Sequence, residues 1–183
     1  MHYEALNDFV FEKKVPKEIL KKYENKIPEE LYQVWKEYGF GSFMSGYLKI
    51  INPDEYQEIV DEDYFREDSP IPLFSTGMGD IIIWEENKYL ILLNFKLKDL
   101  SVISSGFDFF FEDIVEDEGF GKNDLEWGLY PKAVEKYGQL AYDECFGFVP
   151  LLGLGGAEKV ENMEKVKLIE HIQVITHLLG PIE

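Results

Sequence analysis

Helical spacing of apolar residues marks the first part of the chain, and prolines mark where its helices begin. Pro16 and Pro28 each precede a run in which apolar residues recur three or four positions apart, the pattern of a helix with one buried face. Proline is favoured in the first turn of a helix, where its missing N–H has no partner to lose. The pattern predicts helices that begin near these two prolines, the second ending at Gly39, and a third helix that begins at Asn52 and Pro53.

The middle of the chain has the pattern of strands. Runs rich in β-branched and aromatic residues are separated by turn residues, and they cover residues 71–75, 80–84, 89–95 and 100–104. The two central runs are apolar on both faces, as in strands that are covered from both sides. We expect these runs to form an antiparallel meander. Residues 47–51 predict one more short strand, and residues 40–43 predict a turn before it.

The last third of the chain predicts helices around one irregular apolar segment. Helices are expected at residues 106–115 and 131–137, with a linker-like loop at residues 120–127. Residues 145–157 are the most apolar and glycine-rich part, which favours a short strand or a set of turns that packs into the core. A long helix is then expected from about residue 162 to residue 179.

These elements together predict an α+β fold. Its centre is an antiparallel β-sheet meander surrounded by helices, with the long C-terminal helix packed on the core. The irregular segment at residues 145–157 carries too much apolar surface for a domain of about 80 residues to bury alone. We therefore expect residues 1–104 and residues 105–183 to be two domains that pack as one unit.

The net charge of the chain indicates which classes of partner are expected. Its 36 acidic residues against 18 basic ones give a formal net charge of -18. Phosphate binding needs a basic surface, so nucleic acid and anionic membranes are not expected partners. A basic protein partner is favoured, although acidity alone also serves solubility. One cysteine, Cys145, excludes an internal disulfide, and no export signal or membrane span is visible, so we expect a cytoplasmic protein.

The histidines, the cysteine and the acids show no catalytic or metal-binding pattern in the sequence. His171 and His177 lie six positions apart, so on a helix their side chains point about 120° from each other and cannot hold one metal. His171 is expected to be partly buried, and Cys145 to be a small buried apolar residue. We expect no catalytic residue, no metal and no cofactor, because no phosphate loop or activated nucleophile is present.

Acidic residues cluster in two segments that are expected to connect helices and strands. Connecting segments are where a rigid fold most often presents its binding residues. We interpret these acids as candidate partner-binding residues, against the alternative that they are solvated loops: Asp61, Glu62, Asp63, Glu67 and Asp68 in the first segment, and Glu116, Asp117 and Glu118 in the second.

Two sets of short motifs resemble a known family of bacterial proteins. In the C-terminal part they are Tyr137-Gly138, Gly147-Phe148-Val149-Pro150, Gly155-Gly156, Val160-Glu161-Asn162, Lys165-Val166-Lys167 and Glu170-His171. In the N-terminal part they are the stretch from Ile27 to Gly39 and the helix start at Asn52. They resemble the type VI secretion immunity proteins, in which a GAD-like domain precedes an immunity-protein C-terminal domain. A proline-initiated helix that ends in Tyr-Gly also occurs in SUKH-type immunity proteins.

The resemblance implies a protein that binds and neutralises a cognate secreted toxin. The acidity adds that the toxin is basic, as a nuclease would be, and that its active site or substrate groove is covered. A different class stays open: a small enzyme or ligand-binding module with its site in the cleft between the two halves, built on His171, Cys145 or Tyr142 near an acid. We expect a monomer or a weak homodimer.

Overall fold

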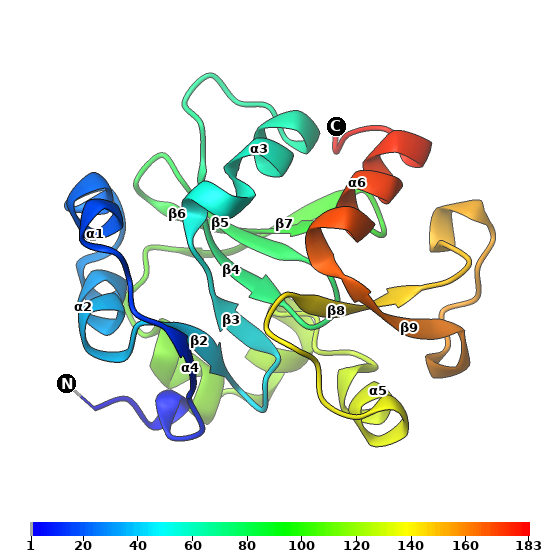
Figure 1. Cartoon of the computed structure of the whole chain (residues 1–183), viewed down its shortest axis with the longest axis horizontal. Helices are drawn as coiled ribbons and strands as arrows, with labels where there is room; N and C mark the ends of the chain where they lie inside the picture. Colours follow the sequence, from blue (N-terminus) through cyan, green and yellow to red (C-terminus); the bar gives the residue numbers. More distant parts are fainter. Residues whose placement is uncertain (1) are drawn as a thin grey trace.

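The computed structural model describes residues 2–183 and places one large sheet at the centre of the molecule (Figure 1). This sheet has seven antiparallel strands that follow one another in chain order, so every connection joins neighbouring strands. The strands are β1 (Val10–Lys13), β2 (Phe40–Phe43), β3 (Leu48–Ile50), β4 (Ile71–Thr76), β5 (Ile81–Glu85), β6 (Tyr89–Asn94) and β7 (Asp99–Ser105). The predicted α+β meander is confirmed.

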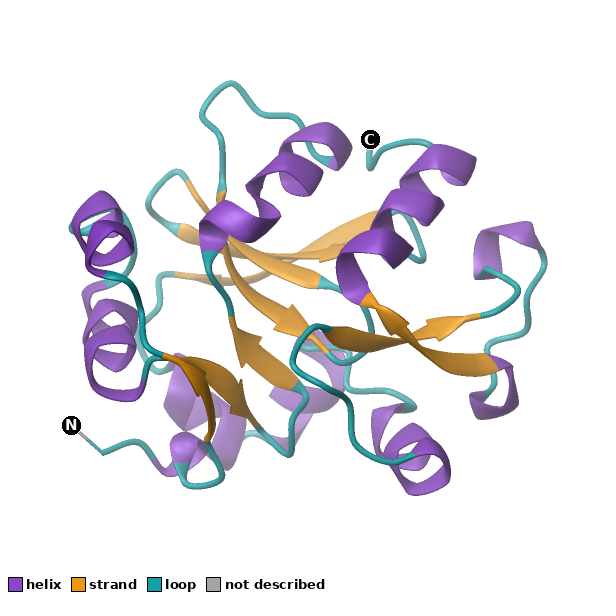
Figure 2. Ribbon diagram, viewed as in Figure 1, coloured by secondary structure: helices purple, strands orange, loops and turns teal. Residues whose placement is uncertain are grey.

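Helices cover both faces of this sheet (Figure 2). The proline-initiated helices appear as α1 (Lys17–Tyr23), α2 (Glu29–Tyr38), α3 (Pro53–Asp63) and α5 (Tyr130–Tyr137), with α4 (Phe110–Glu116) between the last two. The C-terminal helix is α6 (Leu168–Leu179). The Asn52 side chain accepts a hydrogen bond from the Asp54 N–H, 3.2 Å away, and so caps α3 as expected.

The strands β5 and β6 are buried on both faces, because their alternate side chains enter two separate cores. Ile82 and Leu92 belong to the first core, which is rich in aromatic residues and is covered by α1, α2, α4 and α5. Ile83 and Leu93 belong to the second core, which is mostly aliphatic and is covered by α3 and α6. A run of residues that is apolar at every position is what such a two-sided environment requires.

Residues 40–43 form strand β2, so the predicted turn was wrong. Gly41 misled the prediction, since glycine is common in turns. It pairs with Phe11 on one side and Ile50 on the other. A Cβ atom at Gly41 would lie 2.5 Å from the Phe9 ring, so the glycine makes room for an aromatic side chain that crosses the strand.

The predicted loop at residues 120–127 was also wrong, since it contains the short helical turn η2 (Phe120–Asp124). Phe120 and Leu125 are buried in this segment. The buried hydroxyl of Tyr47 donates a hydrogen bond to the Leu125 carbonyl. The segment is therefore a packed part of the first core and not a linker.

The C-terminal helix begins later than predicted. Residues 163–167 form strand β9 (Met163–Lys167), which pairs antiparallel with β8 (Glu144–Phe148) in a second, two-stranded sheet. Three of the five residues of β9 are charged and exposed, which hid the strand pattern. The helix α6 then starts at Leu168 and packs against α3 in the second core.

The strand β8 connects the two halves of the chain. The Phe146 N–H donates to the Gly77 carbonyl, 2.8 Å away, in the turn between β4 and β5. The side chain of Cys145 enters the second core, and that of Phe146 enters the first. In the turn after β8, Gly156 lets two parts of the backbone approach closely, because a Cβ atom there would lie 2.0 Å from the Pro150 carbonyl oxygen. Apolar residues of both halves thus share both cores.

Candidate functional site

The first acidic segment, residues 61–68, is partly built into the fold. Residues 61–63 are the last turn of α3 and not a loop, which corrects the prediction. The carboxylate of Asp63 is only 1% exposed and accepts hydrogen bonds from Lys98 Nζ at 2.9 Å and Thr176 Oγ1 at 2.8 Å. Asp61 accepts from Gln57 Nε2 at 2.9 Å and from Ser69 Oγ at 2.5 Å. Asp63 therefore holds α3, the β6–β7 turn and α6 together.

The remaining acids of the first acidic segment face solvent. Glu62, Glu67 and Asp68 are exposed, and Phe65 between them is 77% exposed. The guanidinium of Arg66 lies 3.6 Å from the centre of the Tyr64 ring and its Nε lies 3.6 Å from Glu85 Oε1. Arg66, the basic residue of this segment, therefore contacts Tyr64 and Glu85, and the exposed ring of Phe65 lies among acidic residues.

The second acidic segment, residues 116–118, is exposed at all positions. Asp117 Oδ1 accepts a hydrogen bond from the Gly119 N–H at 2.8 Å, so this carboxylate closes the turn after α4. Glu118 lies 3.9 Å from Lys122, and both side chains are largely in solvent. Exposed pairs of this kind contribute little to stability, so the charge of the segment remains available to a partner.

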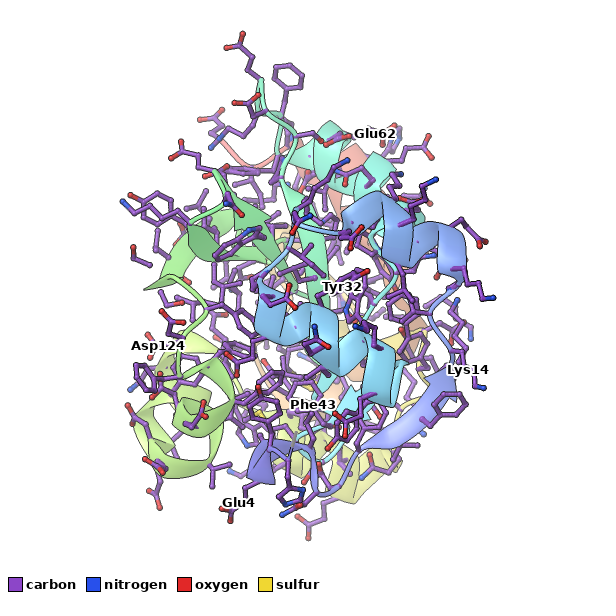
Figure 3. All side chains as sticks on the ribbon, turned by 90° about the vertical axis from the view of Figure 1, so that its left-hand side faces the viewer. Glu4, Lys14, Tyr32, Phe43, Glu62 and Asp124 are labelled. Atoms are coloured by element: carbon purple, nitrogen blue, oxygen red, sulfur yellow. The ribbon has the colours of Figure 1, made fainter. Side chains whose placement is uncertain are left out.

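The two acidic segments do not form one surface. The first follows α3, which packs on the second core, whereas the second follows α4, which packs on the first core. Figure 3 shows Glu62 of the first segment and Asp124, close after the second, well apart on the molecule. A compact partner that covers one segment leaves the other free.

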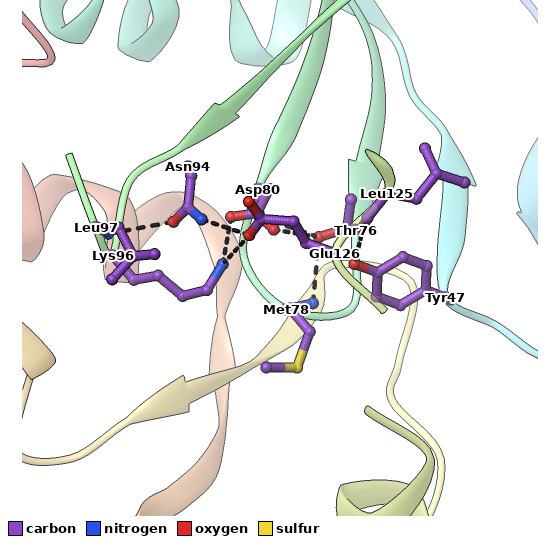
Figure 4. Close-up of polar contacts among 9 residues, drawn as sticks. All are labelled: Tyr47, Thr76, Met78, Asp80, Asn94, Lys96, Leu97, Leu125 and Glu126. Atoms are coloured by element: carbon purple, nitrogen blue, oxygen red, sulfur yellow. Dashed lines mark hydrogen bonds and ion pairs between the residues drawn. The ribbon is translucent and has the colours of Figure 1, made fainter. Parts of the chain in front are cut away.

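Sequence reasoning missed a buried polar network at the start of β5 (Figure 4). Asp80 is fully buried and accepts a hydrogen bond from Lys96 Nζ at 2.7 Å. Thr76 Oγ1 lies 3.3 Å from the same carboxyl group. Burial raises the pKa of Asp80 to about 6, and the Lys96 charge opposes this rise.

Glu126 extends this network into the C-terminal half. Its carboxylate lies 3.6 Å from Lys96 Nζ and accepts a hydrogen bond from the Asn94 side chain. Asp80 and Lys96 stand in turns where acids and lysines are common, so no local signal marks them as buried. The network has donors and acceptors matched to one another, which is the chemistry of a structural ion pair.

A cleft between the two halves, which we call the central cleft, lies where the alternative hypothesis of a ligand-binding module places its site. Its volume is about 610 Å³, and it is lined by Val10, Glu12, Lys13, Ser42, Gly46, Lys49, Glu55, Tyr56, Leu140, Ala141, Tyr142, Asp143 and Ile169. Burial lowers the pKa of Lys49 to about 8. Its Nζ donates to the carbonyls of Ala141, 3.2 Å away, and Glu144. Tyr142 donates to the Ile50 carbonyl at 2.5 Å.

The cysteine and the histidine do not join these groups in one reactive site. Burial raises the pKa of Cys145 to about 12, so its thiol stays protonated near neutral pH. Burial lowers the pKa of His171, and the ring packs on Gly147, where a Cβ atom would lie 2.5 Å from Nε2. Both side chains are buried or half-buried as predicted. Among residues 2–183, no group of His, Cys, Asp and Glu side chains could hold a metal ion.

Comparison with protein families gives two matches. The GAD-like domain matches residues 2–96, which is more than half of the chain. The family described as T6SS immunity protein Tdi1, C-terminal, matches residues 104–179. The chain therefore belongs to the type VI secretion (T6SS) immunity proteins that join a GAD-like domain to this C-terminal domain. An immunity protein neutralises a toxin, and this is the class of function that the family defines.

A solved structure supports the fold. The crystal structure of Atu4351 from Agrobacterium tumefaciens matches with a TM-score of 0.72 over 96% of this chain and 88% of that chain, at 18% sequence identity. A search among curated proteins gave no match. Within residues 2–183 none of the helices has the length and apolar character needed to span a bilayer.

Proposed function

We propose that this chain neutralises a basic, nuclease-type toxin by covering its active site or substrate groove. The observation that carries this proposal is the large surplus of acid, a net charge of -18, together with exposed carboxylates on both acidic segments. A nuclease presents a basic groove to its anionic substrate. An acidic protein surface can occupy that groove in place of the substrate.

The same charge favours rapid encounter. Complementary charge accelerates diffusional association, and the effect falls as salt screens the charges. An immunity protein must reach its toxin before the toxin reaches its target, so a fast on-rate has a direct use. Exposed apolar residues such as Phe65, at 77% exposure, can hold a complex once it has formed.

We also propose that protection needs no chemistry by this chain. Two buried charged groups are held by partners within the chain: Lys49 by two carbonyls, and Asp80 by Lys96. The Cys145 thiol, with a pKa of about 12, is a poor nucleophile. The proposal therefore includes no catalytic residue, no metal and no cofactor, a cytoplasmic place of action, no nucleic-acid or membrane partner, and a monomer or weak homodimer.

The direct experiment measures inhibition. The cognate toxin domain, identified by co-purification with this chain from its native host, is purified, and its cleavage of DNA and of RNA is followed while this chain is titrated. We expect complete inhibition at a one-to-one ratio. Inhibition should require more protein at high salt, because screening weakens the encounter. A toxin domain that binds this chain and still cleaves at full rate contradicts occlusion, and one that cleaves neither nucleic acid contradicts the nuclease assignment.

One observation favours the alternative class, a small-ligand module. The central cleft has the volume of a ligand site, about 610 Å³, and Lys49 with its lowered pKa lies at its wall. A ligand there should raise the melting temperature of wild type and not of a variant with Leu140→Trp, which places a bulkier side chain in the lining of the cleft. The two bonds of Lys49 to backbone carbonyls weigh against this function, because they leave its nitrogen little capacity for a ligand.

A further inference from the structure

The strand β1 is an open edge of the large sheet. It is the first strand in the sheet order and pairs only with β2 among the described residues. Val10 and Phe11 are 64% and 56% exposed. An exposed sheet edge offers unpaired N–H and C=O groups on its outer side, which can bind an extended segment of another protein.

A cavity lies on each side of this edge. The central cleft, about 610 Å³, is lined by Val10, Glu12 and Lys13 of β1, and it continues towards α3 and α6. A second cavity of about 260 Å³, which we call the α1–α2 cavity, is lined by Phe11 and Lys14 and continues towards α1 and α2. The β1 side chains thus alternate between two hollows on opposite faces of the sheet.

A β-bulge explains the one break in this alternation. The register with β2 shifts between Phe11 and Lys13, so Glu12 is the extra residue and both Glu12 and Lys13 face the central cleft. The bulge limits regular pairing along the outer edge to a few residues. That length suits one short partner segment and disfavours the open-ended stacking of sheets.

We propose that an extended segment of the toxin adds to the outer edge of β1 as a further strand of the sheet. Its backbone pairs with β1, and its side chains enter the central cleft and the α1–α2 cavity in alternation. This inference rests on the proposed function, since it names the surface on which the toxin is held. In such complexes backbone hydrogen bonds give affinity and the alternating hollows give specificity.

The linings define the chemistry of the segment. The central cleft presents the exposed carboxylates of Glu12, Glu55 and Asp143. Glu55 is paired with Lys13 at 2.6 Å and Asp143 with Lys167 at 2.7 Å, in exposed ion pairs that a basic partner can replace. Basic side chains fit this side. The α1–α2 cavity is lined by the apolar residues Phe11, Val15, Leu20, Trp35 and Tyr38 and also by the charged residues Lys14, Lys36 and Glu37. Apolar side chains fit its apolar part. The segment alternates basic and apolar residues.

The charge of the chain decides between a toxin and a second copy. Two copies that paired through β1 would bring together two proteins that each carry a net charge of -18, and this repulsion opposes association. A basic toxin gains from the same charge. The exposed Val10 and Phe11 are therefore assigned to the toxin and not to a homodimer.

The test combines hydrogen exchange with a matched pair of variants. The probe is the cognate toxin domain identified by co-purification with this chain, made inactive by substitution in its own catalytic residues. Amide exchange of β1 and β7, the two edges of the sheet, is measured with and without the probe. We expect the outer amides of β1 to become protected and those of β7 to stay unchanged, because only β1 gains a backbone partner.

The variants are Phe11→Lys on β1 and Val102→Lys on β7, two edge positions that are each 56% exposed in the free chain. Phe11→Lys removes an apolar contact and adds a charge that repels a basic segment, so it should weaken binding about tenfold or more. Val102→Lys should bind within about twofold of wild type, a difference below the cost of losing an important contact. Unfolding curves of both free variants establish that the fold is kept.

Each result separates this inference from the proposed function. If wild type does not bind the probe, the proposed function fails and β1 has no toxin to hold. If wild type binds but β1 stays unprotected and Phe11→Lys binds as tightly, the toxin is held elsewhere and the inference is overturned. A concentration-dependent dimer of the free chain that Phe11→Lys abolishes also overturns it, because β1 then belongs to a second copy.

Discussion

The two acidic segments look alike in the sequence and serve different purposes in the fold. Residues 61–68 contain Asp63, whose carboxylate lies in the interior and binds Lys98 and Thr176. Residues 116–118 keep all their side chains in solvent, and the one internal role there is the cap that Asp117 provides to the next turn. Acid content alone does not distinguish a structural carboxylate from one that can meet a partner.

The difference follows from what each segment can contact. The end of α3 lies beside α6 and the β6–β7 turn, so a carboxylate that points inwards finds partners from both. The end of α4 leads into a tight turn at the surface. A buried charge must be paired, because leaving it unpaired costs several kcal/mol, whereas an exposed one is solvated by water.

Both acidic segments belong to one folded unit if the two halves of the chain share their cores. Separating the halves should therefore have the largest effect. Residues 1–104 and residues 105–183 are expressed apart. Neither fragment should unfold cooperatively, because Cys145 and Phe146 of one half complete cores built by the other. Circular dichroism during heating is the measurement. If both fragments are soluble and melt cooperatively alone, the shared core is wrong and the two segments belong to independent domains.

The next prediction concerns Asp63, the buried acid of the first segment. Asp63→Ala leaves the Lys98 ammonium and the Thr176 hydroxyl without their buried acceptor. The free energy of unfolding should fall by about 3 kcal/mol, the usual loss when one partner of a buried ion pair is removed. Urea unfolding gives the value. The matched control is Glu62→Ala in the same helical turn, which is exposed and should change stability by no more than about 0.5 kcal/mol.

An equal loss of stability in the two variants would contradict the distinction between structural and surface acids in this segment. A loss in neither would mean that the bonds of Asp63 are no stronger than its hydration in the unfolded chain.

A third prediction uses pH to examine Asp80, the other buried acid. Its pKa in the folded protein is raised to about 6 from an ordinary value of 3.8. Between about pH 4 and pH 6 the folded chain therefore binds more protons at this site than the unfolded chain does. The stability that this site contributes is present at the acid end of the window and is lost as the pH rises through it.

The measurement compares wild type with Asp80→Asn, which cannot titrate. Relative to wild type, the free energy of unfolding of the variant should rise as the pH increases from about 4 to about 6. A relative change of the opposite sign would show that the Lys96 charge outweighs burial and holds the pKa of Asp80 below its ordinary value.

These buried acids also show where reasoning from the sequence ends. The two-faced strands β5 and β6 and the proline-initiated helices were predicted, because the pattern that forms them is local. The contact between Asp63 and Thr176 joins residues 113 positions apart. No pattern within the acidic segment carries that information, so the sequence placed Asp63 among the candidate surface residues.

The same limit explains the missed strands. Strand β9 has charged residues at three of its positions, Glu164, Lys165 and Lys167, and its apolar neighbours continue the helical spacing of α6. Only the pairing with β8 makes it a strand. Strand β2 was missed for a similar reason, since the role of Gly41 depends on the Phe9 ring that crosses it. Which acidic surface binds the toxin is a property of the complex and remains a prediction.

A fourth prediction sharpens the comparison between the exposed parts of the two segments. Two triple variants are made, Glu62→Gln/Glu67→Gln/Asp68→Asn and Glu116→Gln/Asp117→Asn/Glu118→Gln, and Asp63 is left intact. Because the segments lie on opposite faces, we expect unequal effects on the association rate with the toxin domain. The first variant should associate more slowly, since this segment begins in the last turn of α3, the helix that also carries the Glu55 that lines the central cleft.

Stopped-flow association at several salt concentrations is the measurement. The difference should shrink towards about 0.15 M salt, where the screening length is about 8 Å, and the dissociation rate should change little. If both variants associate as fast as wild type at low salt, neither segment faces the toxin during encounter and their acids serve solubility alone. Equal slowing of both would mean that only the total charge matters.

The smallest expected effect concerns His171 and Cys145, which stand outside both segments. Burial lowers the pKa of His171 and raises that of Cys145 to about 12, so neither side chain is charged near neutral pH. Burial is the largest influence on both pKa values. Cells that carry the toxin gene should survive equally well with wild type, His171→Gln or Cys145→Ser. The serine variant is the less stable of the two because its hydroxyl is buried, so its soluble amount must be matched to wild type. A variant that is folded, binds the toxin domain with normal affinity and yet fails to protect would show that this chain acts on its partner chemically as well as by covering it.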